Sequence, residues 1–239
     1  MTVSQAEIGA VLVTLARATG LAATAPVIGE AGGSMRARLV FVIAVSLAVG
    51  FDRAPVELGD VPGTAGLELA TGLLVGLIAS FVLARVAVAG QLIGLSLGLG
   101  FASQYDVHAG ESAGTTRQLA TTLGGLAFVM AGGLEAVVKS VAAAPADVSH
   151  LASLGPELVR QGCAAFPAGV ALAAPIVLAA LASHVGLAIM NRAAPAVNMF
   201  SLALACTLIV GGFVLLVSAA HLVGGATDAA KLAIDALGR

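Results

Sequence analysis

Apolar residues in this chain are gathered into long runs, which short polar, glycine-bearing or proline-bearing stretches separate. The runs cover Ile8–Ile28, Leu39–Gly50, Leu67–Phe101, Leu119–Val141, Cys163–Met190 and Met199–Val223. The main separating stretches are Gly29–Arg38, Asp52–Gly66, Ser103–Gln118 and Ala142–Gln161. A further short segment, Thr227–Leu237, carries charges at intervals and predicts a surface helix. Because long apolar runs with few charges are typical of membrane-spanning helices, the pattern predicts an all-α, multi-helix membrane protein with about six hydrophobic helices.

Two of the runs have lengths that do not suit a plain bilayer. Leu39–Gly50 is shorter than the roughly 20 residues that a span needs. Leu67–Phe101 would extend for roughly 50 Å as one helix, against a hydrocarbon core of about 30 Å. It contains no proline, but Arg85 lies near its middle. We therefore expect this run either to protrude beyond the membrane or to fold back on itself near Arg85.

The composition supports a membrane protein and argues against several other classes. Of the 239 residues, 59% are hydrophobic and 10% are charged, and the mean hydropathy is +1.05. A soluble domain has about 45–50% apolar and about 25% charged residues. The net charge of -2 offers no basic face to nucleic acid. Arg17 interrupts the first run, and no Lys or Arg precedes it, so we expect this run to belong to the mature protein rather than to a signal peptide.

No pattern of residues indicates an enzyme, a cofactor or a bound metal. The four histidines have no second ligand or nucleophile at a useful spacing. No Ser/His/Asp order, phosphate-binding loop or dinucleotide fingerprint occurs, and the paired carboxylates of an intramembrane protease are missing. Cys163 and Cys206 are too few for a disulfide framework and are interpreted as small buried residues. We therefore predict that the chain is not an enzyme and needs no cofactor.

Glycines recur at helical spacing within the longest run. Gly90, Gly94 and Gly98 fall every four residues and would share one face of a helix, and Gly72 and Gly76 form a second such pair. Glycine lets two helix backbones approach closely inside a membrane. The spacing predicts close helix packing, but it does not separate a helix of the same chain from a helix of a partner subunit.

Four ionisable residues are predicted to be buried charges because they lie within apolar runs: Arg17, Arg85, Glu135 and Lys139. Each costs on the order of 3 kcal/mol in hydrocarbon unless it is paired or hydrated. Glu135 precedes Lys139 by four residues, which predicts a self-satisfying pair on one helix. Arg85 has no partner close in sequence. The alternative interpretation is a pathway through Arg85 and Glu135, which would make the protein a small-solute or ion transporter.

The end of the longest run and the loop after it form a more specific motif. Residues 89–102 read AGQLIGLSLGLGFA, and Tyr105-Asp106 follow in a polar loop. This arrangement resembles the signature of the FliR family, whose counterpart in injectisomes is SctT. Residues 25–29 (APVIG), with Arg36 and Arg38 after them, and residues 194–200 (APAVNMF) resemble two further elements of the family, in family order.

The resemblance implies a structural and gating subunit of the type III protein export apparatus, in a flagellum or an injectisome. FliR-like proteins assemble with several copies of FliP and FliQ into a helical core, which is the portal of the secretion channel. FlhB- and FlhA-like export proteins are further expected partners, and unfolded exported proteins would pass through the channel. The expected location is the bacterial inner membrane, with much of the assembly on its periplasmic side.

The resemblance also implies a division of the chain and a pore plug. FliR looks like a fusion of two units, which places a FliP-like part at residues 1–145 and a FliQ-like part at residues 146–239. The plug of the family is the loop after the glycine-rich helix, which is Ser103–Arg117 here. We expect the plug residues to be Phe101, Ser103, Gln104, Tyr105, Asp106, Val107 and His108. Beyond residue 200 the family has Gly-Phe-Pro and a Lys that this chain lacks, so no role of that lysine is carried over.

Overall fold

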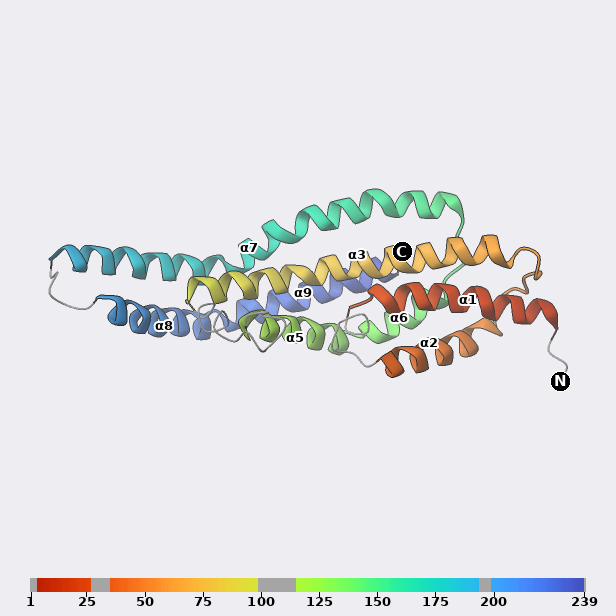
Figure 1. Cartoon of the computed structure of the whole chain (residues 1–239), viewed down its shortest axis with the longest axis horizontal. Helices are drawn as coiled ribbons and strands as arrows, with labels where there is room; N and C mark the ends of the chain where they lie inside the picture. The colour runs from red at the N-terminus through yellow and green to blue at the C-terminus, as the bar shows by residue number, and fades with distance from the viewer. Residues whose placement is uncertain (1–3, 27–34, 99–114, 194–198, 239) are drawn as a thin grey trace. The chain divides into compact units, whose positions relative to one another are not determined.

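The computed structural model describes residues 4–26, 35–98, 115–193 and 199–238, and within these ranges every regular element is an α-helix (Figure 1). The helices are α1 (Gln5–Thr24), α2 (Met35–Gly50), α3 (Val61–Ser96), α5 (Thr115–Met130), α6 (Gly133–Ala142), α7 (Val148–Ala193), α8 (Met199–Val217) and α9 (Ala219–Leu237). The predicted all-α fold is confirmed.

Contacts among the described residues divide the chain into two compact units that do not follow its linear order. The first unit draws on Met1–Leu83, Phe128–Ala164 and Ala230–Arg239, and the second on Ala84–Ala127 and Ala165–Ala229. Helices α3, α5, α7 and α9 therefore contribute residues to both units. The predicted division at residue 145 concerns likeness to two other proteins, and it stays a prediction.

In the first unit, α1 starts with a capping box and packs against α2 and α6. The Glu7 N–H donates to Ser4 Oγ over 3.3 Å, and the Ser4 N–H donates to the Glu7 carboxylate over 2.7 Å. These two bonds satisfy amide groups that would otherwise be left open at the helix start. The buried core between the helices is made of small and β-branched residues, namely Ala18, Ala22, Val42, Val45 and Val141.

Glycines bring α1 and α3 into direct backbone contact in this unit. A Cβ added at Gly72 would overlap the carbonyl oxygen of Arg17, and one at Gly76 would overlap the side chain of Thr24. From the opposite side, a Cβ at Gly20 would overlap the backbone of α3. Such close approach requires small residues at the interface. Gly72 and Gly76 therefore lie against a helix of the same chain.

The second unit has a similar contact between α3 and α5. A Cβ at Gly90 would overlap Ala120, and one at Gly94 would overlap Thr116. Gly90 and Gly94 therefore also lie against a helix of the same chain. Beside this contact, α3 and α7 share an apolar core made of Ala89, Ile93, Leu97, Ala173 and Ile176.

Gly98 does not share the helix face that its spacing predicts, because α3 ends at Ser96. Its φ of 74° lies in the left-handed region, which glycine enters without steric cost. The Gly98 N–H donates to the carbonyl of Leu95 over 3.2 Å. Gly98 therefore ends the helix as a C-terminal cap, and its role in helix packing stays a prediction.

The longest helix in the N-terminal half, α3, is continuous over 36 residues and has no break at Arg85. At 1.5 Å per residue it extends for about 54 Å. The expectation that the chain folds back near Arg85 is therefore wrong, and the over-long helix is the correct alternative. The helix also begins at Val61, before the apolar run starts.

Two predicted runs are broken rather than continuous. Leu119–Val141 is divided into α5 and α6, which meet at 64°, and Gly132 at the break has a φ of 90°. Glycine adopts this conformation cheaply, so it permits the sharp bend. Met199–Val223 is divided at Ser218 into α8 and α9, which meet at 57°. The predicted surface helix at Thr227–Leu237 is therefore the last part of α9 and not a separate element.

Helix α7 is longer than the hydrophobic pattern predicts. It begins at Val148 and continues to Ala193, so most of the stretch Ala142–Gln161 is helical rather than a connection. Only residues 143–147 link α6 to α7.

Three helical segments are long and apolar enough to cross a membrane by length and composition, and the number rises to five if each bent pair counts as one span. The three are Gln5–Thr24, Val61–Ser96 and Val148–Arg192, among the described parts of the chain. With 16 residues, α2 is too short, as its apolar run predicts.

Candidate functional site

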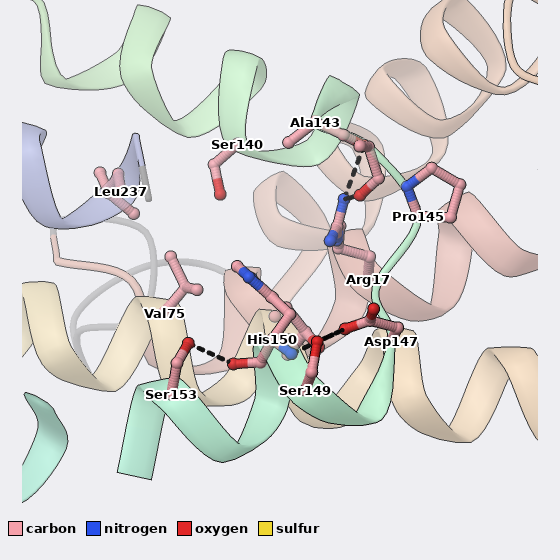
Figure 2. Close-up of a pocket in the computed structure, with 13 residues that line it drawn as sticks. Arg17, Val75, Ser140, Ala143, Pro145, Asp147, Ser149, His150, Ser153 and Leu237 are labelled. Carbon is pink, nitrogen blue, oxygen red and sulfur yellow. Dashed lines mark hydrogen bonds between the residues drawn. The ribbon is translucent and has the colours of Figure 1, made fainter. Parts of the chain in front are cut away.

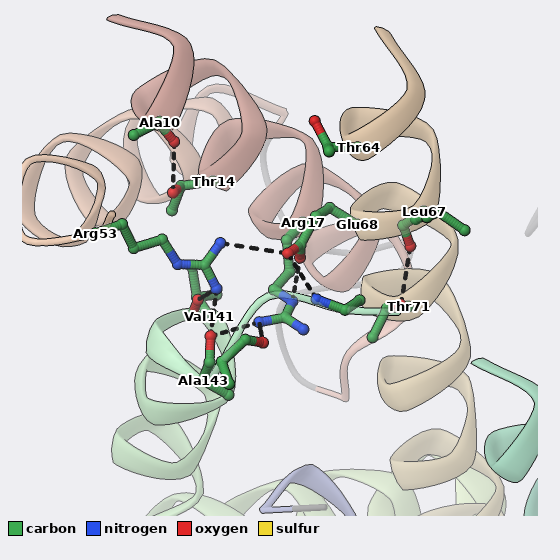
Figure 3. Close-up of polar contacts among 12 residues, drawn as sticks. Ala10, Thr14, Arg17, Arg53, Thr64, Leu67, Glu68, Thr71, Val141 and Ala143 are labelled. Atoms are coloured by element: carbon green, nitrogen blue, oxygen red, sulfur yellow. Dashed lines mark hydrogen bonds and ion pairs between the residues drawn. The ribbon is translucent and has the colours of Figure 1, made fainter. Parts of the chain in front are cut away.

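Two arginines and one glutamate from three separate segments form a buried ion cluster in the first unit (Figure 3). Arg17 lies on α1, Arg53 follows α2, and Glu68 lies on α3. Arg17 Nε is 2.6 Å from Glu68 Oε2, and Arg53 Nη1 is 3.5 Å from Glu68 Oε1. The exposed fractions of the three side chains are 3% for Arg17, 10% for Arg53 and 2% for Glu68. Two positive charges thus share one negative charge away from solvent.

Both arginines also hold the C-terminal end of α6. Arg17 Nη1 donates to the carbonyls of Ala143 and Ala144, over 2.8 and 3.1 Å. Arg53 Nη2 donates to the carbonyl of Val141 over 3.0 Å and also to that of Ala143. The last carbonyls of a helix have no partner within the helix, and the end carries a partial negative charge. The guanidinium groups therefore satisfy these carbonyls and complement that charge.

Glu68 contacts the start of α7 as a hydrogen-bond acceptor, whereas the arginines act as donors at the end of α6. Its Oε1 accepts a hydrogen bond from the Ala146 N–H over 3.0 Å, one residue before Asp147. The Asp147 carboxylate accepts from the His150 N–H over 2.7 Å and from Ser149 Oγ over 2.8 Å, so it caps α7. The hydrogen bond from the His150 N–H holds the pKa of the Asp147 carboxyl below its usual range. Negative groups thus gather where the helix dipole is positive.

The close contact of α1 and α3 explains how Glu68 reaches Arg17. Glu68 and Gly72 are four residues apart on α3, so they share one helix face. Because Gly72 has no side chain, the backbone of α1 at Arg17 comes directly against α3. The glycine contact and the ion pair are therefore parts of the same interface.

Not all buried polar atoms of the cluster have a hydrogen-bond partner. Arg53 Nε is buried and finds no hydrogen-bond partner among the described residues. Glu68 Oε2 takes part in the ion pair but in no aligned hydrogen bond. Removing one member of such a buried cluster leaves an uncompensated charge and costs about 3–5 kcal/mol, whereas replacing all members by apolar residues is often neutral.

A cavity of about 500 Å³ is lined by Arg17 of the cluster and by residues of the α6–α7 connection (Figure 2). Arg17 and His150 border it, together with the hydroxyl-bearing residues Thr71, Ser140, Ser149 and Ser153. Apolar lining comes from Val75, Ala143, Ala144, Pro145 and Leu237. The cavity therefore leaves the connection without tight packing on one side.

The cluster binds backbone groups, and its residues do not form a catalytic or metal-binding site. Arginine keeps its charge throughout the physiological pH range, so it does not act as an acid or base here. In the parts of the chain that the structure describes, no group of three His, Cys, Asp or Glu side chains could hold a metal ion. We therefore consider the cluster a structural site.

Comparison with known proteins places this helical chain in a family. Residues 8–232 match the family described as bacterial export proteins, family 1. The chain belongs to this family. It is 27% identical over 214 residues to the flagellar biosynthetic protein FliR of Escherichia coli (strain K12), which covers 82% of the chain and 79% of that protein. The FliR of Caulobacter vibrioides is 28% identical over 213 residues, covering 82% of each chain.

A third relative, the FliR of Aquifex aeolicus, is 30% identical over 156 residues, which cover 63% of the chain and 60% of that protein. The resemblance to the FliR family that the sequence motifs indicate is thereby confirmed. The chain is a FliR-family protein of the flagellar and type III export apparatus, with membrane helices, and a component of that apparatus rather than an enzyme.

The buried charges predicted for this FliR-family chain have different outcomes. Arg17 is buried and paired. Arg85 is half-buried on α3. Glu135 and Lys139 form a pair over 2.7 Å and expose 71% and 74% of their side chains within this chain, so their burial in the membrane or against a partner stays a prediction. Both point away from the buried face of α6, which carries Val137 and Val141.

Sequence reasoning missed the two other members of the cluster, Glu68 and Arg53. Glu68 is the second residue of the run Leu67–Phe101, and it is the only acidic residue in that run. An acid inside a long apolar run was a usable signal for a buried partner. Arg53 gave no such signal, because it lies in a polar connection.

The predicted plug residues of the family lie outside the described residues. This applies to Phe101, Ser103, Gln104, Tyr105, Asp106, Val107 and His108.

Proposed function

We propose that this chain is a structural and gating subunit that forms the export-gate pore together with FliP-like and FliQ-like subunits. The match to the export family over residues 8–232 carries the proposal. The pore would lie in the bacterial inner membrane at the base of a flagellum or injectisome, next to FlhB- and FlhA-like proteins. Unfolded exported proteins would pass through it. Residues 1–145 would take the place of a FliP-like unit and residues 146–239 that of a FliQ-like unit.

The exposed apolar side chains of the second unit support an assembled state. On α7, Leu178, Leu181, Val185 and Ile189 expose 62%, 56%, 53% and 66% of their surface. On α8, Phe213 exposes 66%. Apolar surface of this extent marks contact with lipid or with other proteins. Both are expected of a membrane subunit in a larger complex.

The test is native mass spectrometry of the chain after co-expression with candidate FliP-like and FliQ-like subunits and purification in detergent. We expect a discrete complex that contains one copy of this chain and several copies of each partner. A stable monomer or homodimer that ignores these subunits would contradict the proposal. Robust solute uptake by the chain alone in liposomes would favour a transporter instead.

The gating role rests on the segment after the glycine-rich helix, predicted as Ser103–Arg117, which we propose as the plug of the closed pore. The last three residues of this predicted loop belong to the start of α5. Deletion of residues 103–110 should let small solutes leak through cells that hold an otherwise assembled gate. The leak is measured as loss of a small dye or ion gradient, and assembly is verified by co-purification. A gate that stays tight after this deletion would remove the plug assignment.

A further inference from the structure

We propose that Arg17, Arg53 and Glu68 are positioning residues, which fix the α6–α7 connection through ionic and hydrogen-bond contacts where apolar packing does not. The connection, residues 143–147, joins two helices that belong to the first unit up to residue 164. The proposal concerns this chain by itself and does not depend on the pore.

The first argument is that packing cannot fix the connection. The side chains of Ala143, Ala144, Pro145 and Asp147 are exposed. The same four residues line the half-open cavity of about 500 Å³. A backbone segment that is exposed and borders a cavity lacks the dense contacts that hold a core element in place. Its position must therefore come from the polar contacts.

The second argument is that the polar contacts reach both helix ends at once. The arginines donate to the carbonyls of Val141, Ala143 and Ala144, at the end of α6. Glu68 accepts from the Ala146 N–H, at the start of α7. The same carboxylate pairs with both arginines, so it couples the two sets of contacts. Each helix end meets the charge that complements its dipole.

The third argument is that the three charges are anchored on separate segments. Arg17 comes from α1, Arg53 from the connection after α2, and Glu68 from α3. Figure 3 shows the side chains of Arg17, Arg53 and Glu68 close together beside Val141 and Ala143. Three attachment points on separate segments would determine the place of the connection relative to α1 and α3. An arrangement that served stability alone would not need charges, because apolar side chains of similar volume stabilise a core equally well.

The test is amide hydrogen exchange of the full chain in detergent, read at the last turn of α6 and the first turn of α7. Glu68→Gln keeps the shape of the side chain but removes the charge that joins both arginines. We expect amide exchange in these two turns to accelerate about tenfold or more, because a hydrogen bond to a charged group contributes roughly that factor.

The triple variant Arg17→Met/Arg53→Met/Glu68→Met separates positioning from stability. We expect it to keep a melting temperature close to that of the wild type, since replacing a whole buried cluster by apolar residues is often neutral. Its exchange at the two turns should nevertheless stay fast. Glu135→Gln, which alters the exposed pair on the same helix α6, serves as the control and should leave exchange unchanged.

Two results would overturn the proposal. One is wild-type protection of both turns in Glu68→Gln. The other is wild-type protection in the triple variant, because apolar packing would then be sufficient to position the connection. If Glu68→Gln does not fold, the triple variant alone decides the question.

Discussion

Glu68 and Glu135 both stand in apolar runs and both pair with a basic side chain, yet their surroundings are opposite. Glu68 exposes 2% of its side chain and meets arginines from two other segments. Glu135 exposes 71% and meets Lys139 one turn along its own helix. The hydropathy of the surrounding run is therefore a poor guide to the burial of a charge in this fold. What decides burial is whether another segment packs over the helix face that carries the charge.

The largest expected difference between the two glutamates is in stability. Glu68→Gln should lower the free energy of unfolding by about 3–5 kcal/mol, because two guanidinium groups lose their buried counter-charge. Thermal unfolding of the full chain in detergent measures the change. A loss below about 1 kcal/mol would mean that solvent or another acid replaces Glu68.

A smaller effect is expected from the glycine that brings Glu68 to Arg17. Gly72→Ala should cost about 1–3 kcal/mol, since the new Cβ would overlap the Arg17 carbonyl oxygen and push α1 away. Gly66→Ala on the same helix is the matched control, because a Cβ at Gly66 has nothing within 4 Å. Alanine is the better helix former, so the control should be neutral or more stable by up to about 1 kcal/mol. Equal effects of the two substitutions would show that the α1–α3 contact is not tight.

A pH-dependent effect is expected from Asp147 at the start of α7. Its carboxyl has a lowered pKa in the folded chain, chiefly because it accepts the hydrogen bond from the His150 N–H. The cap therefore stabilises the fold fully above the ordinary carboxyl pKa of about 3.9, and this contribution is lost as the pH falls through the lower folded value. The difference in melting temperature between the wild type and Asp147→Asn should shrink between about pH 5 and pH 3. A constant difference over this range would contradict the capping role.

The smallest change in stability is expected from a substitution of Glu135. Glu135→Gln should leave the melting temperature unchanged, because the pair with Lys139 is exposed and solvent screens it. The measurement uses the same detergent and pH as for Glu68→Gln. A marked destabilisation in the complex, but not in the chain alone, would reveal a partner at this surface.

The sequence predicts the helices of this chain well because their apolar runs are long, but it predicts their ends poorly. The break between α5 and α6 depends on a positive φ at Gly132, and the end of α3 depends on one at Gly98. Glycine spacing alone predicts helix packing, and it does not show which glycine leaves the helical conformation. Asp147 marks the true start of α7, inside a stretch that hydropathy assigns to a connection.

At the candidate site, too, a contact between residues close in sequence could be predicted, whereas contacts between residues far apart in sequence could not. The pair of Glu135 and Lys139 could be predicted, because helix geometry fixes a spacing of four residues. The pairing of Glu68 with Arg17 and with Arg53 could not be predicted, since these residues meet only through tertiary contacts. The presence of a buried partner could still be inferred, because an isolated arginine is costly inside an apolar core.

The most direct test is a cryo-electron-microscopy map of the complex purified after co-expression with FliP-like and FliQ-like subunits. We expect one copy of this chain among several copies of the partners, with Glu68 in contact with Arg17 and Arg53 and with the Ala146 amide. A map in which this chain forms a complex without those subunits would contradict the proposed function. A map in which Glu68 pairs with a residue of another subunit, and the α6–α7 connection keeps its place, would contradict the positioning role.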